Sequence, residues 1–174
     1  NLLHGHNSFG EELAGFPFQS TDRVRSSPAI GDVDNDGQME IVFGNSSGKL
    51  YIINQDGSQQ LAYTQLGFVE GAPALVDIDG DQDLEIIFTT TTGSGGQVYV
   101  IHHNGVTESG FPKEIGSMFA GPAVHDLDND GVVDVVCVTY DKEIYVIEAI
   151  GGAIKSGFPF TAESRFSMPA TIVD

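Results

Sequence analysis

The sequence predicts an all-β fold in which four-stranded antiparallel sheets repeat as the blades of a β-propeller. Acidic segments open at Asp32, Asp77, Asp126 and Asp174, spaced by 45, 49 and 48 residues. Runs of β-branched and aromatic residues follow the first three segments, and no helical periodicity is present. Four-stranded units that repeat at this length and are apolar on both faces stack face to face. Radial repetition then leaves only short edges exposed.

Each repeat contains its elements in the same order. A Pro-Ala pair leads into the acidic segment, a β-rich run follows it, and a variable turn leads to a second run that contains a tyrosine. Such runs between Gly, Asn and Ser clusters are typical of strands, and runs apolar at both alternate positions indicate burial on both faces. The Pro-Ala pairs stand at 28–29, 73–74, 122–123 and 169–170, the first runs at 41–43, 86–89 and 135–138, and the second runs at 50–53, 98–101 and 144–147.

A Gly-Phe-Pro motif indicates the last strand of a repeat. It occurs at 15–17, 110–112 and 157–159. Because proline has no N–H to donate to the strand ladder, a proline within a short strand places that strand at the edge of its sheet. We therefore expect an outer fourth strand at each motif, and we expect the phenylalanine to pack between blades rather than to bind a ligand.

The repeat period divides the chain into blades. Residues 1–174 are predicted to form a single partial propeller of about three complete and two partial blades. Since four to eight blades close a ring, we expect a segment of a longer protein, whose other blades or other copies of the chain cover its terminal edges. The approximate blades are 1–20 (partial), 21–67, 68–114, 115–162 and 163–174 (partial).

The acidic segment at 126–134 has the pattern of a cation-binding loop. Asp126, Asp128, Asp130 and Asp134 place four carboxylates within nine residues. These charges repel one another unless a cation lies between them. Gly131 allows a sharp turn, after which a backbone carbonyl can complete an all-oxygen shell. Such a shell suits Ca²⁺ better than Mg²⁺ or a transition metal.

Two other segments repeat this pattern with changes. Residues 32–40 end in Glu40 instead of aspartate. Residues 77–85 carry Gln82 at the glycine position, and Gly80 stands two residues earlier. Because Gln82 lacks the conformational freedom of glycine at a turn, we expect the segment at 77–85 to bind a cation more weakly.

The recurring loops, Pro-Ala pairs and apolar runs resemble the FG-GAP / VCBS repeat family over essentially the whole chain. That family includes the calcium-binding blades of integrin α-subunit propellers and many secreted bacterial proteins. The resemblance implies a propeller with Ca²⁺ held in the turn between the first two strands of a blade. The implied ligands are Asp32, Asp34, Asp36, the Gln38 carbonyl and Glu40; Asp77, Asp79, Asp81, the Asp83 carbonyl and Glu85; Asp126, Asp128, Asp130, the Val132 carbonyl and Asp134; and Asp174 at the start of a fourth loop.

Other metal sites and catalytic sites have weaker support in the sequence. An EF-hand loop requires a glutamate at its twelfth position and flanking helices, whereas the twelfth residues here are Phe43, Phe88 and Cys137. No His/Cys spacing typical of a zinc site recurs, and no nucleophile elbow is present. We therefore predict a non-enzymatic protein. The histidines predicted to be polar turn residues are His4, His6, His102, His103 and His125.

Composition disfavours nucleic-acid binding and a membrane-spanning segment. The net charge is −18, and 14 of the 25 acidic residues lie in the loops, while the seven Lys and Arg residues are scattered. Nucleic acid is therefore not an expected partner. No run of about 18 apolar residues could span a membrane. Cys137 stands in an apolar run and is predicted to be a buried structural thiol.

These features predict a calcium-stabilised extracellular or cell-surface scaffold for adhesion or protein interaction. Loops of this kind fill at free Ca²⁺ near the millimolar range, which is found outside the cytosol. Partners would bind the loop-bearing faces. Two alternatives remain open: a carbohydrate-binding propeller, which the absence of tryptophan disfavours, and an accessory domain of a secreted enzyme whose active site lies outside this chain.

Overall fold

The chain folds into short strands joined by turns. The computed structural model describes residues 1–65, 67–118, 120–166 and 168–172. No helix occurs among these residues, and thus none long and apolar enough to cross a membrane. The strands are β1 (Leu2–Leu3), β2 (Phe18–Gln19), β3 (Ala29–Gly31), β4 (Glu40–Gly44), β5 (Lys49–Ile53), β6 (Gln59–Thr64), β7 (Ala74–Val76), β8 (Glu85–Thr91), β9 (Gly96–Ile101), β10 (Lys113–Ile115), β11 (Ala123–His125), β12 (Asp134–Val138), β13 (Glu143–Glu148) and β14 (Phe160–Thr161).

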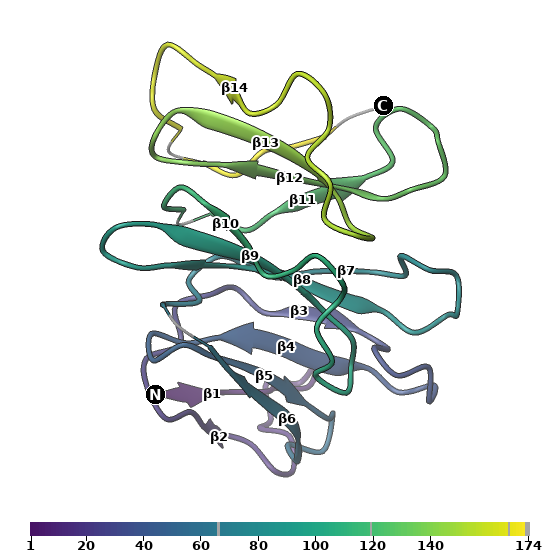
Figure 1. Ribbon diagram of the computed structural model, residues 1–174. Coiled ribbons are helices and arrows are strands. Elements are labelled where there is room, and N and C mark those ends of the chain that lie inside the picture. Colours follow the sequence, from purple (N-terminus) through teal and green to yellow (C-terminus); the bar gives the residue numbers. More distant parts are fainter. Residues whose placement is uncertain (66, 119, 167, 173–174) are drawn as a thin grey trace.

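The strands form three four-stranded sheets and one two-stranded sheet. The orders are β3-β4-β5-β6, β7-β8-β9-β10 and β11-β12-β13-β14, and β1 pairs with β2. Neighbouring strands within these sheets pair antiparallel. The sheets stack one above another in chain order (Figure 1). The prediction of an all-β chain of four-stranded antiparallel sheets is confirmed.

The same register joins the two central strands of each sheet. The tyrosine of the third strand lies opposite the fourth residue of the second strand, in the pairs Phe43–Tyr51, Phe88–Tyr99 and Cys137–Tyr145. Two of these pairs are stacked rings, with centroids 5.3 Å apart for Phe43 and Tyr51 and 4.9 Å apart for Phe88 and Tyr99. The shared register makes positions in one sheet comparable with positions in the next.

Apolar side chains fill the spaces between successive sheets. Every residue of β8 and of β12 is buried, as expected for strands covered on both faces. Cys137 is buried as predicted, and burial raises the pKa of its thiol to about 12. The three clusters include Phe43, Tyr51 and Ile53 with Phe16 and Phe18; Val42, Leu50 and Ile52 with Ile86, Phe88 and Ile101; and Ile87, Val98 and Val100 with Val135, Cys137 and Ile147.

The Gly-Phe-Pro motifs precede edge strands. The motif at 15–17 leads into β2, that at 110–112 into β10 and that at 157–159 into β14, and the three Phe-Pro bonds are cis. β10 and β14 are the outermost strands of their sheets, as predicted from the prolines. Phe16 and Phe111 pack against the clusters between sheets, in agreement with a packing role for these two rings.

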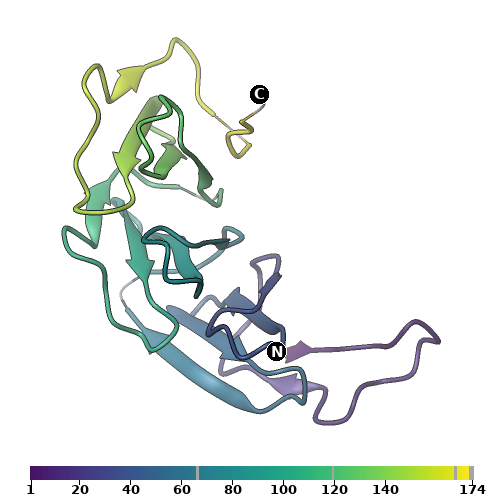
Figure 2. The same ribbon diagram turned by 90° about the vertical axis from the view of Figure 1, so that its right-hand side faces the viewer.

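The first strands of successive sheets lie close to one another. β7 contacts β3 on one side and β11 on the other. The approach is tightest before β11, where a Cβ added at Gly121 would lie 2.0 Å from the carbonyl oxygen of Ala72. Only glycine fits there. Seen from the side, the stack of sheets follows a curved row (Figure 2).

Candidate metal centres

The three acidic segments form the turns between the first and second strands of the four-stranded sheets. We call them loop 1 (32–40), loop 2 (77–85) and loop 3 (126–134). Loop 1 joins β3 to β4, loop 2 joins β7 to β8, and loop 3 joins β11 to β12. Strands, not helices, therefore flank each loop.

The first aspartate of loops 1 and 3 folds the loop around its own carboxylate. Asp32 accepts hydrogen bonds from the backbone N–H groups of Asp36 and Gly37, both at 3.0 Å. Asp126 accepts from Asp130 at 3.1 Å and from Gly131 at 2.9 Å. The glycines have φ angles of 87° and 88°, which L side chains rarely adopt. The equivalent glycines thus give both loops the same turn.

The ninth residue closes each loop from the core side. Glu40, Glu85 and Asp134 are at most 2% exposed. Each carboxylate accepts a hydrogen bond from the backbone N–H of the second loop residue, at 2.9 Å from Val33, 2.9 Å from Ile78 and 3.2 Å from Leu127. A hydrogen bond to an ionised carboxylate is a strong one. The ninth residue therefore ties the start of the loop to the beginning of the second strand.

The seventh residue of each loop also has a shared contact. The backbone N–H groups of Gln38, Asp83 and Val132 donate to the carboxylates of Asp36, Asp81 and Asp130, at 2.8, 3.1 and 2.8 Å. These are the residues whose carbonyls were predicted to bind the ion. Asp174, the predicted start of a fourth loop, lies outside the described residues.

Loop 1 brings three carboxylates together. One oxygen each of Asp32, Asp34 and Asp36 lies within 4.8 Å of the others. Among the described residues, the buried Oδ1 of Asp34 has no hydrogen-bond partner. Burial raises the pKa of Glu40, and the charges of these aspartates raise it further. A buried carboxylate oxygen with no donor, beside several other negative charges, fits a hard divalent cation.

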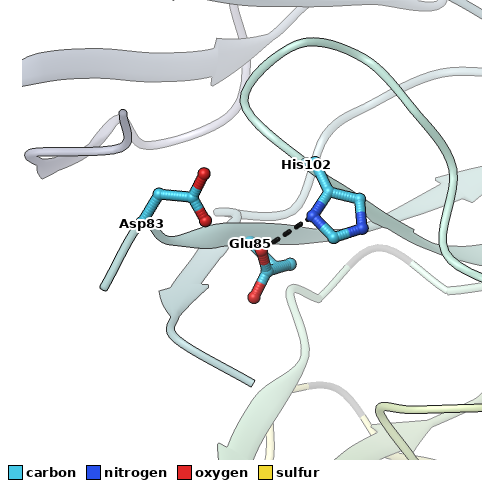
Figure 3. Close-up of side chains that lie close together, drawn as sticks. All are labelled: Asp83, Glu85 and His102. Carbon is cyan, nitrogen blue, oxygen red and sulfur yellow. Dashed lines mark ion pairs between the residues drawn. The ribbon is translucent and has the colours of Figure 1, made fainter. Parts of the chain in front are cut away.

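Loop 2 forms two overlapping clusters. Asp77, Asp79 and Glu85 make one, and Asp83, Glu85 and His102 make the other, each with ligand atoms within 4.8 Å of one another. Figure 3 shows the second cluster, with the His102 ring beside the Glu85 carboxylate. Gln82 takes a φ of 82°, so it adopts the turn conformation that glycine has in the other loops.

Loop 3 already contains a positive charge. Asp126, Asp128 and Asp134 converge, and Lys155 Nζ lies 2.7 Å from Asp128 Oδ1, 3.1 Å from Asp134 Oδ2 and 3.5 Å from Asp130 Oδ2. The hydrogen bond to Asp128 is the main reason that the pKa of Lys155 is raised above its usual value. An ammonium group therefore lies among the carboxylates of the loop whose sequence best matches a calcium motif.

One position after the third strand contacts the loop in two of the sheets and contacts His102 in the other, and the sequence analysis did not find it. We call it the facing position: Gln60, Glu108 and Lys155. The three residues are equivalent because each comes two residues after the carbonyl that closes the turn following the third strand. The turn hydrogen bonds run from Asn54 N–H to Ser58 at 2.9 Å, from His102 N–H to Val106 at 2.9 Å and from Glu148 N–H to Ala153 at 2.8 Å. Gln60 Nε2 donates to Asp34 Oδ2 at 2.8 Å, and Glu108 contacts His102. An alignment of the three turns would have revealed the position.

Comparisons with known proteins agree with the repeat period. A family model described as FG-GAP-like repeat matches residues 32–88 and 77–137, together more than half of the chain. No curated protein sequence matches. The crystal structure of the V. cholerae biofilm matrix protein Bap1 is similar at 20% identity and a TM-score of 0.39, over 83% of this chain and 30% of that chain. This chain thus spans less than a third of the length of that protein.

Proposed function

Because the chain belongs to the FG-GAP-like repeat family, we propose that it is a non-catalytic calcium-binding segment of an extracellular β-propeller that acts as an adhesion or interaction scaffold. The observation that carries the proposal is the convergence of Asp32, Asp34 and Asp36 in loop 1, the loop that the buried Glu40 closes. A Ca²⁺ ion bound there would tie β3 to β4.

Calcium is the cation that best fits loop 1. The side chains that converge there offer only oxygen, which hard cations prefer, and the turn is an open surface loop that can adapt to six to eight ligands. Gln60 adds an amide beside Asp34 and brings no charge. Loops of this class fill at the Ca²⁺ concentrations found outside cells, which supports a secreted or cell-surface location.

The arrangement of the sheets supports a propeller. Three four-stranded sheets share a side on which β3, β7 and β11 lie together, and the row of sheets is curved. Radial repetition of blades needs both features, and four to eight blades close a ring. Further blades of the same protein, or other copies of the chain, would complete it. A protein or glycan partner would bind the loop-bearing faces of this rigid scaffold.

Removal of calcium is expected to lower the melting temperature of the chain. At free Ca²⁺ between one and ten times Kd, a site adds about 0.4–1.4 kcal/mol to the free energy of unfolding by mass action. Thermal melts with Ca²⁺ and with EGTA measure the difference. Asp34→Asn should remove most of it. Asp56→Asn is the matched control, because Asp56 is exposed and accepts from the backbone N–H of Ser58, a bond that asparagine can also accept.

Identical melts of the unmodified chain in Ca²⁺ and in EGTA would contradict calcium binding. An equal loss of the Ca²⁺ effect in Asp34→Asn and Asp56→Asn would show a response to charge in general, without a site at loop 1.

The isolated chain is expected to self-associate. β6, β10 and β14 are edge strands, whose unpaired backbone groups pair readily with other chains. Phe160 in β14 is also 55% exposed. Light scattering as a function of protein concentration should show species larger than the monomer. A monomer that persists at high concentration would argue against open propeller edges.

A further inference from the structure

We propose that loop 2 holds a first-row transition metal ion of the Zn²⁺ class through His102, Glu85 and Asp83. One ligand atom of each lies within 4.8 Å of the other two, and Figure 3 shows the three side chains. The donors come from three places: the end of loop 2, the start of β8 and the turn after β9. The site goes beyond the calcium function, and it does not depend on loop 1.

Glu85 supplies a buried oxygen that points into the cluster. The side chain is 0% exposed. Its Oε2 accepts from the N–H of Ile78 at 2.9 Å. Its Oε1 has no hydrogen-bond partner among the described residues, yet it lies 3.0 Å from His102 Nδ1. A buried carboxylate oxygen without a donor is costly, and a bound metal ion removes that cost.

His102 lies between two carboxylates. Its Nδ1 lies 3.0 Å from Glu85 Oε1 and its Nε2 lies 3.3 Å from Glu108 Oε2. A metal ion would take the place of a proton between Nδ1 and Glu85, while Nε2 donates to Glu108. Metal-binding histidines commonly donate their second nitrogen to a carboxylate in this way. Two ligands of a tetrahedral zinc ion bound at about 2.0–2.2 Å lie roughly 3.3–3.6 Å apart, so His102 Nδ1 and Glu85 Oε1, which are 3.0 Å apart, would separate slightly to hold the ion.

Asp83 provides the third donor. Its Oδ1 is buried and has no hydrogen-bond partner in the described part of the chain. Its Oδ2 lies 3.0 Å from His103 Nδ1, so the neighbouring imidazole approaches the other oxygen of the carboxylate. Three protein ligands and a water would complete a tetrahedral shell.

The donor set explains why loop 2 differs from its neighbours. Imidazole nitrogen with carboxylate suits zinc and its first-row neighbours, whereas Ca²⁺ takes oxygen. The turn residue equivalent to His102 is Asn54 beside loop 1 and Glu148 beside loop 3, on the evidence of the shared turn hydrogen bonds. Neither offers an imidazole. The transition-metal chemistry therefore belongs to loop 2.

Cobalt binding tests the proposal. The full chain is stripped with EDTA, freed of chelator and titrated with Co²⁺, and the visible d–d absorption is followed. Binding of one equivalent, with the intense d–d absorption of a four-coordinate shell, is expected. His102→Asn should lower the Co²⁺ affinity at least about 100-fold, and Glu108→Gln, which only loses the orienting bond, about 10-fold. His102→Asn introduces the residue of the equivalent turn beside loop 1, so the fold is retained, and a melt checks this.

Two variants serve as controls. His6→Asn changes an exposed histidine that stacks on His4, and it should leave the Co²⁺ absorption unchanged. Asp34→Asn should also leave the Co²⁺ absorption unchanged, so a failure of calcium binding at loop 1 can be distinguished from a failure of metal binding at loop 2. Absence of the absorption in the unmodified chain, or equal affinity in His102→Asn, would overturn the proposal. The latter result would mean that His102 and Glu85 form a plain ion pair.

Discussion

Lys155→Gln is expected to increase the Ca²⁺ affinity of loop 3 by about tenfold or more, because the number of charges at a loop sets its affinity. In the native chain, Lys155 Nζ lies 2.7 Å from Asp128 and 3.1 Å from the buried Asp134. A Ca²⁺ ion in loop 3 would have to displace this ammonium group. Glutamine removes the competing charge and introduces the residue that stands at the facing position of loop 1.

The effect can be measured by titration calorimetry with Ca²⁺ in an Asp34→Asn background, where loop 1 adds little heat. The reciprocal variant, Gln60→Lys, should abolish the calcium-dependent melting shift of loop 1. Lys49→Gln makes the same charge change in β5, in another sheet, and should leave loop 3 unaltered. Unchanged Ca²⁺ binding in Lys155→Gln would show that the lysine does not exclude the ion.

Phe88→Ala is expected to lower the free energy of unfolding by about 3–5 kcal/mol. Phe88 is fully buried between the sheet that contains β4 and the sheet that contains β8. Its ring stacks on Tyr99 with centroids 4.9 Å apart and meets the Tyr63 ring edge-on at 6.1 Å. Removal of the ring leaves a cavity that the surrounding strands can fill only in part.

Urea unfolding followed by circular dichroism measures the loss. Phe160→Ala is the control, because Phe160 is 55% exposed in an edge strand, and it should change the free energy of unfolding by less than about 0.5 kcal/mol. Similar losses in the two variants would mean that the packing between sheets contributes little to stability.

The strands could be predicted from the sequence because their signals are local. The short run at 135–138 is apolar at every position and rich in β-branched valine, which favours a strand covered on both faces. Pro112 predicted an edge strand, and β10, which follows it, is the outermost strand of its sheet. The loop pattern likewise predicted that Asp32, Asp34 and Asp36 converge, since short-range hydrogen bonds build the turn.

The partners of the loops could not be predicted in the same way. Lys155 stands 21 residues after Asp134 and His102 stands 17 after Glu85, so their contacts depend on strand register. The turn from Glu148 to Ala153 is one residue longer than the turn from His102 to Val106, so a sequence alignment without a gap does not pair Lys155 with Glu108, although both occupy the facing position. Gln82 adopts a φ of 82°, the turn conformation of the equivalent glycines, which its residue type does not indicate, and the weaker cation binding expected of loop 2 stays a prediction.

The residue at the facing position can change which ion a repeat binds without changing the strands that carry the loop. The nine loop residues, the strand register and the packing between sheets can all stay the same while a single codon exchanges an amide, a carboxylate or an ammonium group at 60, 108 or 155. The number of acidic loops in a protein of this kind therefore does not give the number of ions that it binds. With the proposed calcium role of loop 1, a lysine supplied by the chain itself would make a repeat independent of the calcium supply, and one molecule would combine calcium-responsive and unresponsive units.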